Sequence, residues 1–245
     1  MIRTEWRTSS PRPVAVVWLD RSDKKNAMTP AMLDDLSSAL AAAAERAAAI
    51  VLVGAGSTFC AGFDLTLCKD NADALRQLLI GLSRTIRLMR EVSVPVVIGA
   101  QGAAIAGGCA LLAGADVVVT HSECRLGYPV VRLGISPAVN APFLARSVGH
   151  GHTREKLLGG RIFDGREAIV CGLAHELAPT PEQVPGLAMV IADRLAVKPR
   201  SGIAATKAWL NELDGCDGWA ERALSASLAL VGTSEERERL AALRG

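Results

Sequence analysis

Short apolar runs alternate with longer stretches at helical spacing through the first half of the chain, and this alternation limits the possible folds most strongly. Each run has four to six residues, which is typical of a strand buried on both faces. Residues 31–49 and 72–92 have helical spacing, and Thr29-Pro30 offers an N-cap followed by proline. This order predicts a parallel α/β sheet with right-handed crossovers. The predicted strands are residues 14–19, 50–53, 94–99 and 117–121.

The last third of the chain has a different pattern, with apolar residues at helical spacing and no convincing strand. We therefore expect a core over residues 1–198 and a helical C-terminal segment over residues 199–245. The predicted helices of this part are residues 151–158, 165–171, 182–196, 202–211 and 218–231.

The composition is typical of one folded domain with a small appendage. Of the 245 residues, 50% are hydrophobic but only 4% aromatic, so the core must consist mainly of Ala, Val, Leu and Ile. The net charge is +2 and charges of both signs are interspersed, which argues against a nucleic-acid or membrane-surface partner.

The sequence also predicts a cytoplasmic protein without a membrane span. No apolar run reaches the ~18 residues that a membrane helix needs. Residues 1–13 are polar and include Glu5, unlike a signal peptide. The six cysteines show no CxxC pair, which is typical of reduced, buried cysteine, and we expect no metal.

Two segments rich in small residues follow predicted strands, residues 59–65 and 102–112. Small residues at strand ends let a ligand approach the backbone, and a helix beginning near Gly107 would direct free N–H groups at it. Two converging N–H groups would form an oxyanion hole. Tight packing turns explain the same residues equally well, and both interpretations stay open on this pattern. Neither segment has the spacing of a phosphate-binding loop.

Three motifs resemble those of the crotonase (enoyl-CoA hydratase/isomerase) superfamily. Residues 20–28 (DRSDKKNAM) resemble its Asn-Ala-Met segment, residues 59–65 (FCAGFDL) its FCAGxDL segment, and residues 100–109 (AQGAAIAGGC) its NGxAxGGG segment. The resemblance covers about residues 14–211. Further similarity follows in family order at residues 133–137, 147–149 and 165–173.

The resemblance implies a ββα spiral core with a C-terminal helical segment that covers the site and forms a homotrimer, often paired into a hexamer. It implies an acyl-CoA ligand, no further cofactor, a place in fatty-acid metabolism, and an oxyanion hole formed by the N–H groups of Ala61 and Gly107. The implied ligand-binding residues are Lys25, Ala27, Phe63, Asp64, Leu65, Ala106, Pro129, Val130 and Leu133.

The chain departs from the hydratase pattern at both glutamate positions. The first glutamate would follow the oxyanion glycine by three residues, where this chain has Ala110; the second would follow Pro129, where it has Val130. Hydration needs a carboxylate pair to position water and move a proton. A standard hydratase is therefore not expected.

Tyr128 and Asp64 are the first candidates to replace the glutamates, although packing for Tyr128 and a structural role for Asp64 explain them more simply. The other candidate side chains also have simple structural explanations, namely an inert cysteine, a turn histidine, a solvated helix start and a variable loop. They are Cys109, His121, His150, His152, Asp70 and Asp73.

Three functions remain open on the sequence. The first is an acyl-CoA enzyme of lyase, isomerase or hydrolase type, performing decarboxylation, thioester hydrolysis or an altered isomerisation, since an oxyanion hole alone stabilises an enolate. The second is a non-catalytic acyl-CoA binder or carrier. The third is an accessory protein of a polyketide or other acyl biosynthetic pathway.

Overall fold

A six-stranded sheet forms the centre of the protein in a computed structural model that describes residues 1–7, 12–69 and 71–242. The strands lie in the order β1-β2-β3-β4-β6-β9, with β1 antiparallel to β2 and the others parallel. All four predicted strands are present, and the predicted parallel α/β class is confirmed. The bounds are β1 Ile2–Arg7, β2 Val14–Leu19, β3 Ala49–Gly54, β4 Val96–Gly99, β6 Val117–His121 and β9 Glu176–Ala178.

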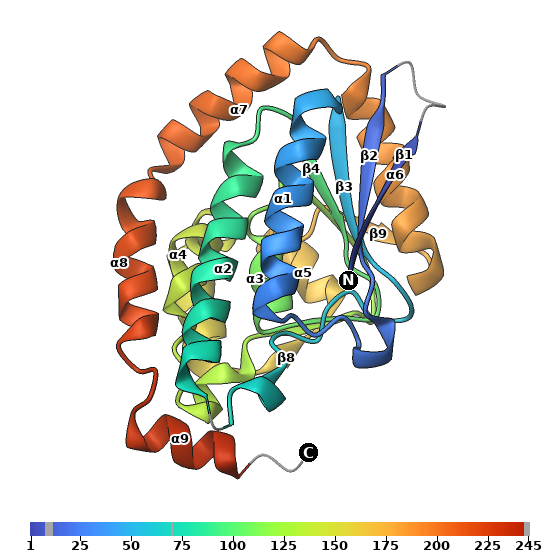
Figure 1. The fold of residues 1–245 in the computed structure, drawn as a ribbon. Helices are drawn as coiled ribbons and strands as arrows, with labels where there is room; N and C mark the ends of the chain where they lie inside the picture. The colour runs from blue at the N-terminus through green and yellow to red at the C-terminus, as the bar shows by residue number, and fades with distance from the viewer. Residues whose placement is uncertain (8–11, 70, 243–245) are drawn as a thin grey trace.

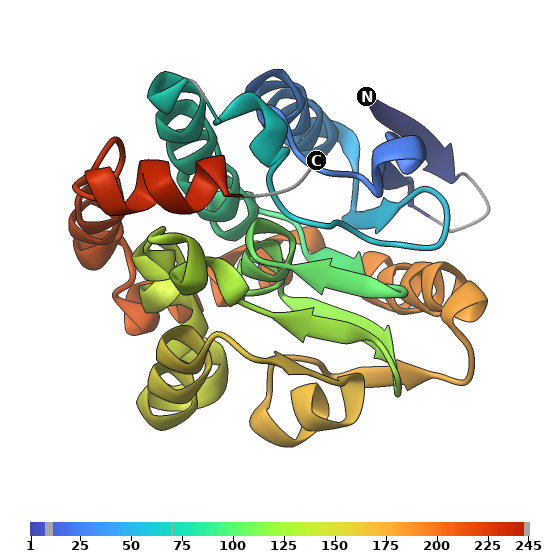
Figure 2. The same cartoon turned by 90° about the horizontal axis from the view of Figure 1, so that it is seen from below.

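Helices cover both faces of this sheet (Figure 1 and Figure 2). Helix α6 (Val184–Ala196) packs small residues on the face formed by alternate valines of β2 and β3. Helices α1 (Pro30–Arg46) and α2 (Ala72–Glu91) cover the opposite face with leucine and methionine side chains. Helix α1 begins as predicted, because the Thr29 hydroxyl accepts a hydrogen bond of 3.1 Å from the Met32 N–H.

A smaller sheet lies beside the first and contains β5 (Ala103–Ile105), β7 (Arg125–Gly127) and β8 (Ile162–Phe163). The chain leaves β5 directly into the short helix α3 (Gly107–Leu112). The expectation of no strand in the last third was wrong, because β8 and β9 both lie there. Segments of two and three residues are too short to show a periodicity of two.

The C-terminal helices pass along the outside of α2 and α4 in an arch (Figure 1). Lys207 connects α7 to the rest of the protein. Its ammonium group donates to the carbonyl oxygens of Met89 and Val94, at 2.8 and 3.0 Å, and pairs with Asp116 at 2.6 Å. The C-terminal helices are α7 Arg200–Asp214, α8 Asp217–Leu228 and α9 Ser234–Ala241, and the earlier helices α4 and α5 comprise Ala141–Gly159 and Gly165–Cys171.

Within the described residues, we find no helix with the length and apolar character needed to cross a membrane. All six cysteines are buried.

Candidate functional site

The two segments rich in small residues meet beside the loop that precedes α1. Residues 59–65 lie between the segment of Ala104 and the loop of Met28. Cys60 forms a β-bridge with Ala104, and Phe63 forms one with Met28. The first is made by hydrogen bonds of 3.1 and 3.0 Å, the second by bonds of 2.7 and 2.9 Å. Residues far apart in sequence are thus fixed against one another through their backbones.

Glycines make this close approach possible. A Cβ atom on Gly107 would lie 2.8 Å from Cε of Met28 and 2.9 Å from the Phe63 ring. On Gly108 it would lie 2.5 Å from the Cys60 carbonyl oxygen. Gly62 has a φ of +101°, which side chains disfavour, and its missing Cβ would come within 3.8 Å of the Gly107 nitrogen.

The structure offers a different pair of N–H groups from the pair expected. The Ala61 N–H donates to the Lys25 carbonyl at 3.0 Å, so it is occupied. The Phe63 N–H points away from Met28, because Met28 bonds to the residues on either side of Phe63. Neither the Phe63 N–H nor the Gly107 N–H has a hydrogen-bond partner among the described residues. The N–H groups of Phe63 and Gly107 are therefore available to a ligand, whereas the Ala61 N–H is not.

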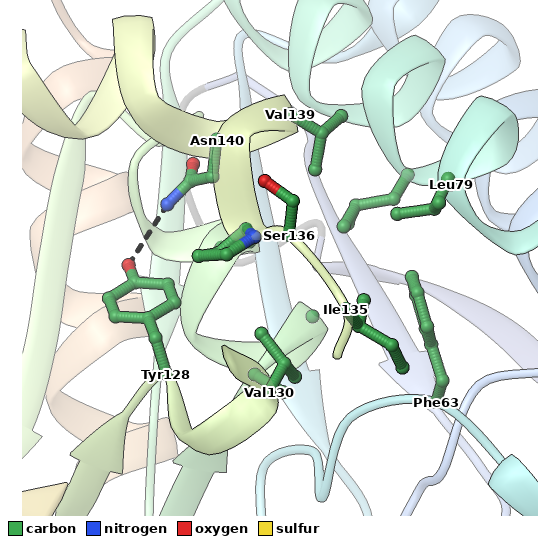
Figure 3. A pocket seen from close by; sticks show the side chains of 13 residues that line it. Phe63, Leu79, Tyr128, Val130, Ile135, Ser136, Val139 and Asn140 are labelled. Atoms are coloured by element: carbon green, nitrogen blue, oxygen red, sulfur yellow. Dashed lines mark hydrogen bonds between the residues drawn. The ribbon is translucent and has the colours of Figure 1, made fainter. Parts of the chain in front are cut away.

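An inner cavity opens beside these N–H groups and has a volume of about 30 Å³ (Figure 3). We call it the acyl chamber, after the acyl-CoA ligand that the family resemblance implies. An outer cavity of about 260 Å³ adjoins it, and both are lined by Phe63, Ala106, Val130 and Ile135. The remaining chamber residues are Leu79, Leu82, Gly107, Ala110, Tyr128, Ser136, Pro137, Val139 and Asn140. The remaining outer residues are Ala61, Leu65, Ile105, Pro129, Arg132 and Leu133.

The acyl chamber contains no Asp, Glu, His, Lys or Arg among its described lining residues. Ala110 and Val130 form part of its wall. Its one titratable side chain is Tyr128, which is 1% exposed, and burial raises its pKa well above 10. The Tyr128 hydroxyl donates to the Cys109 carbonyl at 3.2 Å and accepts from the Asn140 amide at 3.0 Å. Tyr128 therefore stays neutral and is held by two internal hydrogen bonds.

Asp64 lines neither cavity. Its carboxylate pairs with Arg21 at 2.7 Å and accepts from the Thr66 hydroxyl at 2.6 Å. Desolvation acts to raise the pKa of Asp64, but the hydrogen bonds from Thr66 and Arg21 outweigh it and lower that pKa. Arg21 also donates to the Ala27 carbonyl at 2.8 Å. Asp64 thus supports the loop beside the site and does not face either cavity.

The expected ligand residues Lys25 and Ala27 belong to this loop. Lys25 and Asn26 have positive φ values of 50° and 55°. The buried Asn26 side chain stabilises this unusual backbone by donating to the carbonyls of Ala55 and Thr58, at 2.9 and 2.8 Å. Lys25 contacts the site through its carbonyl, which accepts from Ala61.

The other candidate side chains do not meet at the site. Burial raises the pKa of the Cys109 thiol to about 12, so it is no nucleophile. His121 accepts a hydrogen bond of 3.0 Å from the Gly102 N–H, and burial lowers its pKa. His150 and His152 are exposed, and the described residues contain no group of three potential metal ligands.

Asp73 lies in the first turn of α2, with its side chain 83% exposed. Asp70 lies outside the described residues.

Sequence reasoning missed Asn140, which lines the acyl chamber and is 1% exposed. It also missed Leu79 and Leu82 of α2, which line the same chamber. The available signal was a lone asparagine within the apolar stretch PAVNAPF, residues 137–143. A buried amide in such surroundings needs hydrogen-bond partners.

Known proteins with similar sequences and structures support a family assignment. Residues 9–229 match the sequence profile of the family described as Enoyl-CoA hydratase/isomerase. A Thermus thermophilus protein named "Putative enoyl-CoA hydratase" is 33% identical over 86% of this chain and 87% of its own length. A Crotonyl-CoA hydratase of Syntrophomonas wolfei is 28% identical over 94% and 90%.

The solved structure of enoyl-CoA hydratase from Bacillus halodurans superposes with a TM-score of 0.87 at 23% identity, covering 99% of both chains, and it shows the shared fold. The profile match spans most of the chain and includes both segments rich in small residues. The protein therefore belongs to the enoyl-CoA hydratase/isomerase family.

Proposed function

We propose that this protein binds a short-chain acyl-CoA thioester whose carbonyl oxygen accepts hydrogen bonds from the N–H groups of Phe63 and Gly107. The observation that carries the proposal is that these N–H groups are unpartnered among the described residues where the two cavities adjoin. One such donor contributes about 2.7–4 kcal/mol to a transition state. The names of the curated relatives support the same ligand class.

The outer cavity would hold the pantetheine arm of the ligand. It is much larger than the acyl chamber, and Leu65, Pro129 and Leu133 give it an apolar wall. Arg132 adds the positive charge that a CoA phosphate requires. The acyl chamber is much smaller than the outer cavity, so we expect a short acyl group.

We propose that the chemistry differs from two-glutamate hydration. Ala110 and Val130 stand at the positions that the family resemblance assigns to the glutamates, and both line the chamber. Neither side chain can accept a proton from water. Among the remaining reactions, decarboxylation of a malonyl-type thioester needs the fewest catalytic side chains. The bond to CO₂ breaks, the electron pair moves onto the held carbonyl oxygen, and water protonates Cα.

A non-catalytic acyl-CoA carrier is the second candidate, and one observation favours it. Tyr128, the chamber's one titratable side chain, is neutral and has both of its hydrogen bonds within the protein. A chamber lined in this way can hold an acyl group without supplying an acid or a base.

Calorimetry with propionyl-CoA and with S-propyl-CoA, which lacks the carbonyl oxygen, tests the binding proposal. We expect the thioester to bind at least tenfold more tightly. Equal affinities would show that no oxyanion hole operates. Release of CO₂ from methylmalonyl-CoA then separates the enzyme from the carrier, and ordinary rates of crotonyl-CoA hydration would contradict both.

We also propose the homotrimer, or the hexamer of two trimers, that the family resemblance implies. Trp209, Leu210 and Leu213 on α7 and Trp219 on α8 are each more than half exposed. Large apolar side chains gathered on neighbouring helices indicate an interface. Sedimentation of the wild type should give three or six chains, and Trp209→Glu should reduce that number.

A further inference from the structure

A buried histidine at the end of β6 holds the start of the segment that leads to the Gly107 N–H. The Nε2 atom of His121 accepts a hydrogen bond of 3.0 Å from the Gly102 N–H. An imidazole nitrogen accepts a hydrogen bond only when it carries no proton, so this bond assigns the proton of the neutral ring to Nδ1. The bond to Gly102 therefore exists only while His121 is neutral.

The backbone between Gly102 and Gly107 is short and ordered. Strand β5 occupies the positions directly after Gly102, and Ala106 then turns the chain into α3 with a positive φ of 52°. The Ala106 N–H donates to the Gly127 carbonyl at 2.8 Å. Because only a strand and one tight turn separate Gly102 from Gly107, the position of Gly102 constrains that of the Gly107 N–H.

The backbones of Gly102 and His121 are each closely packed on one side. A Cβ atom on Gly102 would lie 1.9 Å from the Ser57 carbonyl oxygen, and one on Gly165 would lie 2.0 Å from the His121 carbonyl oxygen. A proton on Nε2 would place two N–H donors against each other at 3.0 Å. Either the imidazole must turn away or the segment from Gly102 to Gly107 must shift, and Gly102 loses its hydrogen bond in both cases.

The surroundings of His121 keep it neutral at pH 7. Burial lowers the pKa of His121 below its usual value of about 6.5, while the charges of Glu123 and Glu182 act to raise it. Both glutamates are exposed, in the turn after β6 and in the short 3₁₀ helix Pro181–Gln183. Gly165 of α5 and Ala178 of β9, which also lie against His121, carry no charge. The ring therefore gains its second proton only in acid.

We propose that His121 is a positioning residue that makes thioester binding sensitive to pH. The neutral ring keeps Gly102 in place and so directs the Gly107 N–H at the ligand carbonyl, whereas the protonated ring releases Gly102 and weakens binding. This inference rests on the proposed acyl-CoA ligand and adds release in acid to it. His121 lines neither cavity, so it acts through the backbone.

Calorimetry of propionyl-CoA binding at pH 7.5 and pH 5 tests the inference, with His121→Gln beside the wild type. A glutamine oxygen can reach the position of Nε2 and accepts from Gly102 at both pH values. We expect the wild-type affinity to fall about three- to tenfold relative to that of His121→Gln, which is the net contribution of one hydrogen bond. The ratio of the two affinities cancels the titration of the ligand phosphates and of other carboxylates.

His175→Asn is the matched control. The Nδ1 atom of His175 accepts a hydrogen bond of 2.9 Å from the Val118 N–H, and burial lowers the pKa of His175 too. This bond lies at the other end of β6 and does not involve Gly102. The control should therefore keep the pH dependence of the wild type. Loss of that dependence in His175→Asn would overturn the assignment to His121.

Amide hydrogen exchange without ligand gives an independent measurement on the wild type alone. Protection of residues 102–107, corrected for the intrinsic exchange rate at each pH, should fall between pH 7.5 and pH 5 and stay constant in His121→Gln. Unchanged protection in the wild type, or an affinity ratio that does not vary with pH, overturns the inference and leaves the proposed function intact. If propionyl-CoA binds at neither pH, the proposed function fails, and hydrogen exchange still tests whether His121 holds Gly102.

Discussion

The two walls that meet at Gly107 are built by different means. The first, the backbone wall, consists of Gly62, Phe63 and Gly107, and it presents N–H groups held by bridges between distant segments. The second, the side-chain wall, consists of Ala110, Tyr128, Val130 and Asn140, and it gives the acyl chamber its chemical character. The backbone wall accepts few substitutions, since an added Cβ would strike backbone or ring atoms.

The side-chain wall has no such restriction, because its residues can change while the backbone stays in place. On the proposed function, the backbone wall would hold a thioester and the side-chain wall would determine its reaction. A chain that keeps the first wall and changes the second retains the ligand and loses or alters the reaction.

Placing carboxylates on the side-chain wall should have the largest effect. We expect the double variant Ala110→Glu, Val130→Glu to hydrate crotonyl-CoA at least ~100-fold faster than the wild type, the range of general acid–base catalysis. A spectrophotometric assay of the enoyl double bond measures this rate. The double Gln variant has nearly the same size without the acid, and it should stay at the wild-type level.

If the two double variants hydrate crotonyl-CoA equally slowly, the chamber does not place carboxylates against the substrate. The separation between the two walls would then be incomplete.

Disturbing the backbone wall should have the second-largest effect, a loss of ligand affinity. In Gly107→Ala the new methyl group would lie 2.8 Å from Cε of Met28 and 2.9 Å from the Phe63 ring, so these side chains beside the free N–H groups must shift. We expect propionyl-CoA to bind about 10–100-fold more weakly, which is about 1.4–2.8 kcal/mol. Calorimetry measures this loss.

Gly186→Ala is the control, because no atom outside its own helix lies within 4 Å of the added methyl group. It should keep full affinity and gain up to about 1 kcal/mol of stability. Full affinity in Gly107→Ala would show that the close approach is not needed for binding.

Removing the Tyr128 hydroxyl should lower stability and leave binding almost unchanged. Tyr128→Phe leaves the Cys109 carbonyl and the Asn140 amide without this partner, which costs about 1–3 kcal/mol. The thermal midpoint should fall by a few degrees in differential scanning calorimetry, at about 2–4 °C per kcal/mol. A loss of propionyl-CoA affinity beyond threefold would give the hydroxyl a direct role in binding.

The pH dependence of propionyl-CoA affinity also tests whether the Tyr128 hydroxyl has a direct role in binding. Burial raises its folded pKa, so its contribution to stability is complete below the unfolded value of about 10 and is lost only as the pH rises above it. Propionyl-CoA affinity should therefore show no step from Tyr128 between pH 7 and 9. A step that disappears in Tyr128→Phe would contradict this assignment.

The ion pair behind the backbone wall should contribute least. Asp64→Asn removes the charge that holds Arg21, and at pH 7 we expect a loss of about 1 kcal/mol in unfolding free energy. The folded pKa of Asp64 is lowered, so its stabilisation is present above about pH 4 and is lost as the pH falls through the folded value. The wild type and variant should converge in acid.

Urea unfolding at pH 7 and pH 3 measures this difference. Asp73→Asn is the control, since that side chain is 83% exposed, and it should match the wild type at both pH values. A constant difference at both pH values would mean that hydrogen bonding, and not charge, supports the loop.

Features that depend on neighbouring residues along the chain could be predicted from the sequence. The apolar runs predicted the strands of the main sheet, and Thr29-Pro30 marked the start of α1. The segments rich in small residues indicated where two backbones approach, because only small residues fit there. The resemblance also placed Ala110 and Val130 where they line the chamber.

Which polar groups lack a hydrogen-bond partner depends on the three-dimensional fold. The Ala61 N–H is occupied by a carbonyl 36 positions away in sequence, whereas the Phe63 N–H has no partner among the described residues. Asn140 meets Tyr128 through the fold alone, and its amide nitrogen donates to the Tyr128 hydroxyl. Hydrogen-bond saturation is a property of all neighbours in space, so residue order cannot reveal it.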